Sequence, residues 1–376
     1  MKNITATAIL LLSAAPCFAQ TPPATWQEHW FEHNQNLSRV YYDNDLAVYY
    51  DADVNRSITW PQTYLGDVWR YTKRVYGNFG GENRLYAIFH TNKYSGGHPS
   101  TYFDASHDLR NVIDAGPGPW TSGAGNDLDL TTHEVAHIVE LASKNVHGSP
   151  AFGVWGDSKW AEIFNYDVYL GLGRTADATR WYNIAINTRD NFPVADTYWF
   201  RDWFYPIYNQ YGRSAVLNRY FELLAQYFPK NGNDYSRGLN MGEFIHFWSG
   251  AAGVDLKPQA TIAFGWTSQY ESQLVAARNA FPFGYSRGVA TFYQDCGNGG
   301  YFAGLGVGDY SLSEMRKKGL QNDDVSSIAI NAGYQVQLFE HDNFTGASVT
   351  LTGSQGSCLT SNGWNDRVSS MRVRAL

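Results

Sequence analysis

The chain has 376 residues, of which 44% are hydrophobic and 17% are charged, and its formal net charge is −7. This composition is typical of a folded globular protein and excludes a disordered chain. Because phosphate binding needs a basic face, the negative charge also argues against a nucleic-acid partner. The length favours two domains over one.

The first 19 residues predict a signal peptide. Lys2 supplies a positive charge, an apolar run follows at 6–15, and Cys17 and Ala19 place small residues before a cleavage site at Gln20. The apolar run is too short to span a membrane. We therefore expect a secreted protein, extracellular or periplasmic, that acts as a monomer without a membrane partner.

Strand patterns come before helical ones in the next part of the chain. Alternating and β-branched residues predict strands at 39–42, 46–50, 85–89 and 112–116. Apolar residues at helical spacing predict helices at 61–76, 128–142, 158–172, 178–187, 199–211, 214–228 and 241–251. Strands followed by a long helical part predict an α+β domain, for which we expect the bounds 20–285.

The sharpest feature of the sequence is His133-Glu134-Val135-Ala136-His137, which falls in the predicted helix 128–142. Residues four apart lie on one face of a helix, so His133 and His137 are able to bind one zinc ion together. Glu134 lies one step round the helix, where it reaches a water at the metal and acts as the general base. Zinc lowers the pKa of that water towards ~7, so the chemistry needs no covalent nucleophile.

A catalytic zinc site needs a third protein ligand. Glu162 follows His137 on the next predicted helix and has apolar neighbours, so its carboxylate needs a metal or another partner there. We therefore expect Glu162 to be the third zinc ligand. Asp157 and His147 are the alternative ligands. Glu140, one turn beyond His137, is expected either to lie behind the ligands or to be solvated.

The motif and the downstream glutamate resemble the gluzincin group of zinc metallopeptidases. The run 159–167 is similar to the glutamate helix of bacterial collagenases and of plant basic secretory proteins, although the acid that often follows the glutamate by four residues is here one later, at Asp167. The resemblance implies a zincin-like catalytic domain, with a mixed sheet and a helical half, and metalloendopeptidase activity. By analogy, a Tyr or His of the helical half stabilises the oxyanion. The candidates are Tyr198, Tyr205, Tyr208 and His246.

The character of the sequence changes near Gly288 to short alternating strands with many turn residues, which predicts an all-β domain over 286–376. It contains an internal repeat, in which the run 322–327, Asn-Asp-Asp-Val-Ser-Ser, returns at 365–370 as Asn-Asp-Arg-Val-Ser-Ser. Without the signal peptide, Cys296 and Cys358 are the remaining cysteines. An even pair in an exported domain predicts a disulfide.

The repeated tail resembles a calcium-binding, microbial βγ-crystallin domain with a Greek-key fold. Phe339, Phe344 and Gly346 have the family spacing in the second unit, whereas Asn298 replaces the second aromatic residue in the first. Calcium needs six to eight oxygen ligands, which loops rich in Asn, Asp and Ser supply. The resemblance implies two calcium sites, each completed by a backbone carbonyl near Gln294 or Glu340, with these loop residues: Asn322, Asp323, Asp324 and Ser326 in one repeat, and Asn365, Asp366, Arg367 and Ser369 in the other.

Together these features predict a secreted zinc endopeptidase that hydrolyses peptide bonds of extracellular proteins and also binds calcium. The alternative is a secreted calcium-dependent binding or adhesion protein, in which the zinc site is structural or inactive. A third interpretation is a zinc hydrolase that acts on another amide, such as one linked to a glycan.

Overall fold

The computed structural model describes residues 21–29, 33–281, 288–318, 320–330 and 333–376. The predicted signal peptide and the predicted domain boundary at 285 and 286 lie outside these residues. The chain forms two compact units. The first contains the residues up to Arg70 and Asn78–Ile138, and the second contains Tyr71–Gly77 and Val139–Leu376. Within the described part of the chain, no helix is long and apolar enough to cross a membrane.

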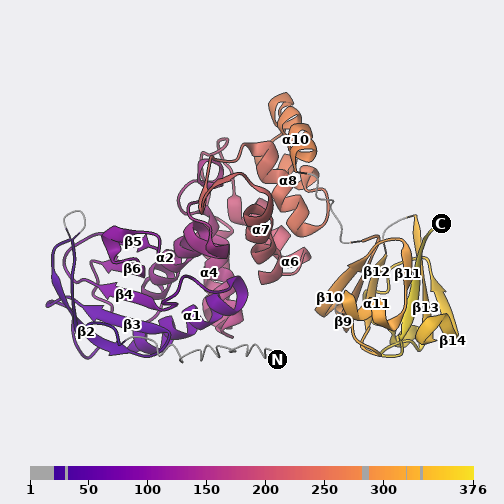
Figure 1. The fold of residues 1–376 in the computed structure, drawn as a ribbon, viewed down its shortest axis with the longest axis horizontal. Coiled ribbons are helices and arrows are strands. Elements are labelled where there is room, and N and C mark those ends of the chain that lie inside the picture. Colours follow the sequence, from indigo (N-terminus) through magenta and orange to yellow (C-terminus); the bar gives the residue numbers. More distant parts are fainter. Residues whose placement is uncertain (1–20, 30–32, 282–287, 319, 331–332) are drawn as a thin grey trace, which may run out of the picture. The chain divides into compact units, whose positions relative to one another are not determined.

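The first unit is built on a six-stranded mixed sheet with the order β1-β2-β3-β4-β6-β5 (Figure 1). Its strands are β1 (Thr25–Gln27), β2 (Asn36–Tyr42), β3 (Leu46–Tyr50), β4 (Leu85–Phe89), β5 (Gly96–Ser100) and β6 (Asn111–Gly116). The strands predicted at 39–42, 46–50, 85–89 and 112–116 are confirmed as β2, β3, β4 and β6. The short strands β1 and β5 were not predicted, because neither has a run of alternating apolar residues.

The centre of this sheet is parallel. β3 pairs with β4, and β4 pairs with β6, in parallel register, and every residue of these three strands is buried. Such strands are covered on both faces, which explains their continuous apolar sequences. The helix α1 (Trp60–Tyr76) makes the crossover from β3 to β4, as the helical spacing at 61–76 predicts. β5 pairs antiparallel with β6 and ends the sheet order.

The helix α2 (Asn126–Ala142) follows β6 and contains the whole His-Glu-x-x-His motif. Its first turn carries Asp127, whose carboxylate accepts hydrogen bonds from the backbone N–H groups of Ser122 (3.1 Å) and Gly123 (3.0 Å). These bonds fix the loop that leads into the helix. The motif therefore lies in the middle of a regular helix, with the preceding loop tied to its start.

The second unit is helical over residues 139–281. The predicted helices are confirmed as α4 (Lys159–Gly171), α5 (Thr175–Ala185), α7 (Ser214–Tyr227) and α8 (Met241–Ala252), with α6 (Tyr205–Gln210) preceded by a π-helical turn, Trp199–Phe204. The short α3 (Phe152–Trp155) and the helices α9 (Lys257–Phe264) and α10 (Ser268–Ala280) were not predicted. A two-stranded ribbon, β7 (Lys230–Asn231) and β8 (Asp234–Tyr235), lies between α7 and α8.

Aromatic side chains fill the core of the helical part. Trp248 of α8 stacks on Tyr220 of α7 with 4.2 Å between ring centroids, and Trp155 stacks on Trp160 at 5.8 Å. Five tryptophans of this part are essentially inaccessible to solvent: Trp155, Trp160, Trp199, Trp203 and Trp248. Much of the aromatic excess in the sequence is therefore used for packing, where each large ring buries 150–250 Å².

The last part of the second unit, from residue 288 onward, consists of two small sheets (Figure 1). One has the order β10-β9-β12 and the other β11-β15-β13-β14. The strands are β9 (Ala290–Asp295), β10 (Gly299–Leu305), β11 (Gly308–Tyr310), β12 (Ser327–Ile330), β13 (Tyr334–His341), β14 (Thr345–Leu351) and β15 (Ser370–Ala375), with one short helix, α11 (Leu312–Lys317). β11 of the first repeat pairs with β15 of the second, so the two repeats share a sheet.

The predicted disulfide is present between Cys296 and Cys358, whose Cα atoms lie 4.6 Å apart. Asn298 and Phe344, which differ between the repeats, have the same left-handed backbone, with φ of 58° and 59°. The change of side chain therefore leaves the turn between the first two strands of each repeat unaltered.

Candidate functional site

The two imidazoles of the His-Glu-x-x-His motif converge on one point. His133 and His137 lie one turn apart on α2, and their Nε2 atoms are 3.0 Å apart. In a tetrahedral site with metal–nitrogen bonds of about 2.0 Å, two ligand nitrogens lie about 3.3 Å from each other. His137 is buried and His133 is half-buried. The pair therefore has the spacing and the partial solvent access that a catalytic zinc needs.

Glu134 is held against the backbone of the strand β5. It is 3% exposed, and a methyl group built on Gly97 would lie 2.2 Å from its Oε1 atom. Any side chain at Gly97 would therefore displace the carboxylate. The absence of a side chain at this strand position allows Glu134 to lie beside the two imidazoles on the helix.

Glu162 lies on α4, in the second unit, and its side chain is almost completely buried. Its Oε1 atom is 3.6 Å from Lys159 Nζ, and among the residues that the structure describes its Oε2 atom has no hydrogen-bond partner. Burial raises the pKa of Glu162 to about 7, and the charge of Lys159 opposes this shift. A buried carboxylate oxygen without a donor is stabilised by a cation, so this side chain fits the role of a metal ligand.

The alternative ligands have different surroundings. Asp157 is exposed in the turn before α4, and His147 is paired through Nδ1 with Asp234 Oδ1 at 2.6 Å. Glu140, on the last turn of α2, accepts a hydrogen bond from Trp155 Nε1 at 2.7 Å and another from the Ser149 hydroxyl. Glu140 therefore anchors the segment that follows α2, and its burial excludes the solvated alternative.

Two of the oxyanion candidates are engaged in the protein interior. The hydroxyl of Tyr208 donates to Asp167 Oδ1 at 2.8 Å, and burial raises the pKa of Asp167 to about 7. His246 Nε2 lies 2.7 Å from the carbonyl oxygen of Phe281. The guanidinium carbon of Arg201 lies 3.6 Å from the ring centroid of Tyr198. Tyr205 packs on Tyr182 with 5.0 Å between the ring centroids. Tyr208 and His246 therefore have structural partners that account for their burial.

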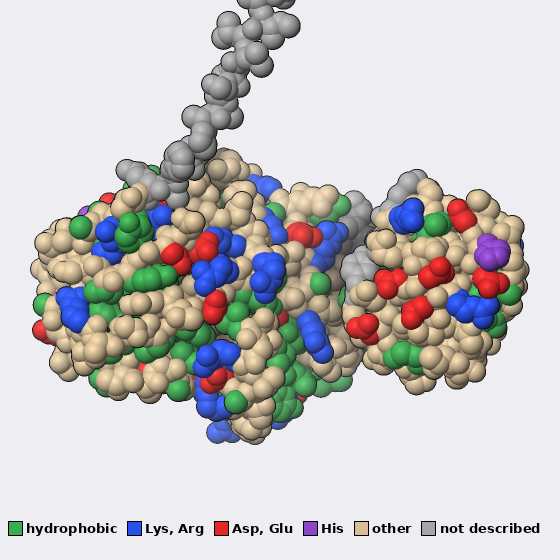
Figure 2. Space-filling view, turned by 90° about the horizontal axis from the view of Figure 1, so that it is seen from below, with side chains coloured by type: hydrophobic (Ala, Val, Ile, Leu, Met, Phe, Trp, Pro, Cys, Tyr) green, Lys and Arg blue, Asp and Glu red, His purple; other side chains and the backbone are tan. Residues whose placement is uncertain are grey.

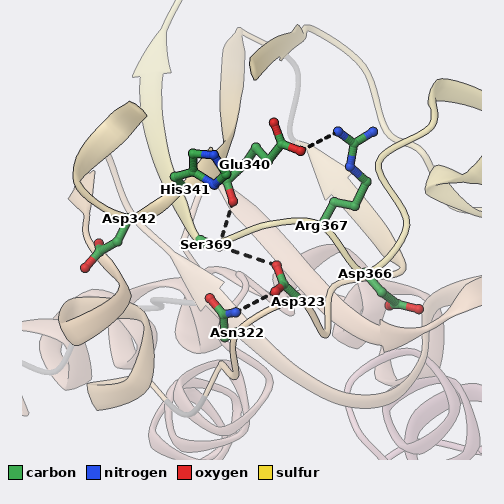
Figure 3. A pocket seen from close by; sticks show the side chains of 8 residues that line it. All are labelled: Asn322, Asp323, Glu340, His341, Asp342, Asp366, Arg367 and Ser369. Carbon is green, nitrogen blue, oxygen red and sulfur yellow. Dashed lines mark hydrogen bonds and ion pairs between the residues drawn. The ribbon is translucent and has the colours of Figure 1, made fainter. Parts of the chain in front are cut away.

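The repeated loops of the β region bring together oxygen atoms from both repeats. The hydroxyl of Ser369 donates to the Glu340 carbonyl oxygen at 2.8 Å and lies 3.4 Å from Asp323 Oδ1 (Figure 3). Asn322 donates to Asp323 Oδ2 at 2.6 Å. A carboxylate, a carbonyl and a hydroxyl therefore face one pocket, which His341, Asp342, Asp366 and Arg367 also line. This is the donor set that Ca²⁺ prefers.

The second loop repeats the contact between a carboxylate and a hydroxyl, with the roles of the two repeats exchanged. The hydroxyl of Ser326 donates to Asp366 Oδ1 at 2.9 Å, and Asn365 donates to Asp366 Oδ2 at 2.6 Å. Asp323 and Asp366 have the same left-handed backbone, with φ of 51° and 52°. Each cluster therefore needs a carboxylate from one repeat and a hydroxyl from the other.

The two clusters differ in charge at their rims. Asp324 is 3.4 Å from the amide nitrogen of Gln294, whereas Arg367, at the equivalent position, pairs with Glu340 Oε1 at 2.7 Å. The hydrogen bond from Arg367 holds the pKa of Glu340 below its usual range. Figure 2 shows acidic side chains gathered on one face of this β region, with few basic ones among them. The negative electrostatic potential on this face therefore favours a bound cation, and the potential is weaker at the rim that carries Arg367.

One group of potential metal ligands was not predicted from the sequence. Glu28, His33, His90 and Asp114 lie close together in the first unit, and all four are buried. The available signal was the position of His90 directly after the predicted strand 85–89 and of Asp114 within the strand 112–116. Pairing of the two strands, which brings these residues together, is not visible in the sequence.

No protein-family model and no curated protein matches this chain. Solved structures of βγ-crystallin domains are similar to 23% of it. A domain from Flavobacterium johnsoniae is 45% identical in sequence to the matched region, with 94% of its own length covered and a TM-score of 0.22. A domain from Clostridium beijerinckii is 32% identical, with 99% of its own length covered and the same TM-score of 0.22. A double mutant of clostrillin, solved in complex with nickel, has 32% identity, 97% covered and a TM-score of 0.22. The described chain contains both helices and strands, and 23% of the chain is similar to solved βγ-crystallin domains.

Proposed function

We propose that this protein is a secreted zinc-dependent peptidase in which His133, His137 and Glu162 hold the metal and Glu134 is the general base. The observation that carries the proposal is the convergence of the two Nε2 atoms, 3.0 Å apart, on the helix that also presents Glu134. The buried Oε2 atom of Glu162, which has no hydrogen bond within the described residues, supports its choice as the third ligand.

Each group has a defined task in the reaction. When bound, zinc acts as a Lewis acid that polarises the scissile carbonyl and makes a water acidic at neutral pH. Glu134 takes the proton from the attacking water and delivers it to the amine that leaves, so one carboxylate serves both steps. His133 and His137, one turn apart on α2, would hold the metal. Gly97 leaves room for the Glu134 carboxylate beside β5.

The proposed zinc set predicts which variants lose the metal. We expect zinc in the purified wild-type chain and a large loss, of about 10-fold or more in affinity, in Glu162→Ala, because a three-ligand site loses one ligand. Asp157→Ala is the matched control and should keep its zinc. The measurement is metal content after dialysis against a weak chelator. If Glu162→Ala holds as much zinc as the wild type and Asp157→Ala loses it, Asp157 is the third ligand instead of Glu162.

A second candidate function is calcium-dependent binding by the β region, and the two interlocked clusters around Asp323 and Asp366 favour it. The peptidase and the binding function are compatible in one chain. A chain that hydrolyses no peptide when fully loaded with zinc, yet still binds calcium, would leave the binding function as the better description.

Calcium binding should stabilise the β region against unfolding. At a calcium concentration of about 100 times the dissociation constant, the gain is about 2.7 kcal/mol for each site. Asp323→Ala and Asp366→Ala should each remove one site in a calcium titration by calorimetry. Asp309→Ala is the control, since this exposed carboxylate is paired with Arg374 outside the clusters. Unchanged stoichiometry in both single variants would exclude these loops as the calcium sites.

A further inference from the structure

The buried group of Glu28, His33, His90 and Asp114 lies at the carboxyl end of the parallel strands. His90 directly follows β4, and Asp114 lies in β6, which pairs with β4 in parallel register. None of the four side chains is more than 5% exposed. Parallel strands end at a common edge of the sheet, so their last side chains meet there. Two acids and two imidazoles are therefore enclosed together in the interior of the first unit.

The atoms of this group have the spacing of a metal site. His90 Nε2 lies 3.0 Å from Glu28 Oε1 and 3.3 Å from Asp114 Oδ1. His33 Nδ1 lies 2.9 Å from Asp114 Oδ2 and 3.7 Å from Glu28 Oε1. In a tetrahedral site with bonds of about 2.0 Å, the ligand atoms are separated by about 3.3 Å. The four separations, 2.9–3.7 Å, range around this value.

Further contacts orient the ligands. His90 presents Nε2 to the group, because its Nδ1 lies 2.9 Å from Asp51 Oδ2, and Asp51 is paired with Lys93 Nζ at 2.7 Å. A carboxylate behind a ligating histidine is the usual outer contact of a metal site. The second oxygen of Glu28 accepts a hydrogen bond from the Gln35 backbone at 3.1 Å. Both the imidazole and the carboxylate are therefore fixed from behind.

The charges of the group favour a divalent cation. Glu28, Asp51 and Asp114 bring three carboxylates into the interior, and Lys93 compensates one of them. Asp114 Oδ1 has no hydrogen bond of good geometry among the described residues, although it lies 3.3 Å from His90 Nε2. With both imidazoles neutral, as metal ligands must be, one divalent ion would balance the remaining two charges. A set of two imidazoles and two carboxylates suits a zinc-type ion, whereas Ca²⁺ and Mg²⁺ prefer oxygen ligands alone.

We propose that Glu28, His33, His90 and Asp114 form a second metal site, which binds a zinc-type divalent ion and serves structure rather than catalysis. Four protein ligands close the coordination sphere, and burial excludes substrate. The ion would join the segment after β1 to the ends of β4 and β6, three segments far apart in the sequence.

The second metal site also borders the strand that supports Glu134. The ring of His98 on β5 contacts His33 with 5.3 Å between centroids, whereas its neighbour Gly97 contacts Glu134. Successive strand residues point to opposite faces. The buried site and Glu134 therefore lie against opposite faces of β5, and the ion would stiffen the strand on which the general base rests.

The test uses the full chain with the helical imidazoles removed. His133→Ala combined with His137→Ala eliminates the proposed catalytic zinc, so any remaining tightly held zinc reports on the second site. We expect about one zinc ion per chain after loading and dialysis, with a shell of nitrogen and oxygen ligands at about 2.0 Å by X-ray absorption. A chain that retains no zinc would overturn the proposal and would leave the peptidase proposal untouched.

Variants within the group provide the second arm. In the same background, His33→Gln should lose the remaining zinc and unfold at a lower temperature, while His29→Gln is the matched control. His29 is an exposed neighbour that pairs with Asp108. If His33→Gln fails to fold, the zinc content of the background chain still decides the question. Full retention of zinc by a folded His33→Gln would show that the ion binds elsewhere and that the group is a hydrogen-bonded ion network.

Discussion

Glu134→Gln should lower peptide hydrolysis by about 10²–10⁴-fold, the usual contribution of a general base, while zinc stays bound. The amide keeps the size of the side chain but cannot accept the proton of the attacking water. Because Glu134 lies beside the ligands and is not one of them, metal content should equal that of the wild type. The assay is cleavage of casein or of a quenched peptide library, with and without a zinc chelator.

The control for this prediction is Glu222→Gln, which makes the same chemical change at a half-buried position of α7, where Glu222 pairs with Arg219. It should keep full activity, so a loss in Glu134→Gln would be specific to the site. A zinc-loaded Glu134→Gln that cleaves peptides at more than a tenth of the wild-type rate would exclude Glu134 as the base.

Gly97→Ala should reduce hydrolysis by about 10²-fold without loss of zinc, since a misplacement of about 1 Å at a catalytic group has an effect of this size. The added methyl group would lie 2.2 Å from Glu134 Oε1 and 2.4 Å from its Cδ, so the carboxylate has to move. The backbone of Gly97 does not have a positive φ, and alanine therefore suits its conformation. The measurement is kcat/KM together with metal content and the melting temperature.

Gly81→Ala is the matched control for Gly97→Ala, because a methyl group there meets nothing within 4 Å. It should retain wild-type kinetics and zinc. Full activity of Gly97→Ala would mean that the position of Glu134 against β5 is unimportant for hydrolysis. A loss of both zinc and activity would indicate that the substitution disturbs α2 as a whole.

The helices show how much of the fold local sequence patterns predict. The stripe of apolar residues at 61–76 agrees with α1 at Trp60–Tyr76, and the motif helix agrees with α2 to within two residues at its start. These helices are regular and have one apolar face, which is the strongest signal in a sequence. By contrast, α10 has a weak apolar stripe, with Leu274 and Ala277 as its buried residues, so it was not predicted.

The strand β5 shows where local patterns fail. Its sequence, Gly-Gly-His-Pro-Ser, has neither alternation nor β-branched residues, and Pro99 is unusual within a strand. It is a strand because the end of the sheet at β6 offers hydrogen-bonding groups that need partners. The same strand supports Glu134, so a part of the candidate site was invisible without the tertiary structure.

The sequence by itself determined the features that depend on residues close together along the chain. Two imidazoles one helical turn apart must share a face of α2, and the two copies of the Asn-Asp-x-Val-Ser-Ser run must form similar loops. These features follow from helix geometry and from repetition alone.

Tertiary structure decided which residues lie around these features. The buried Glu28, His33, His90 and Asp114 meet because parallel strands end at one edge, and Gly97 reaches Glu134 because β5 pairs with β6. These contacts join residues that are distant in sequence. They depend on which strands pair, and no local periodicity in the sequence predicts that pairing.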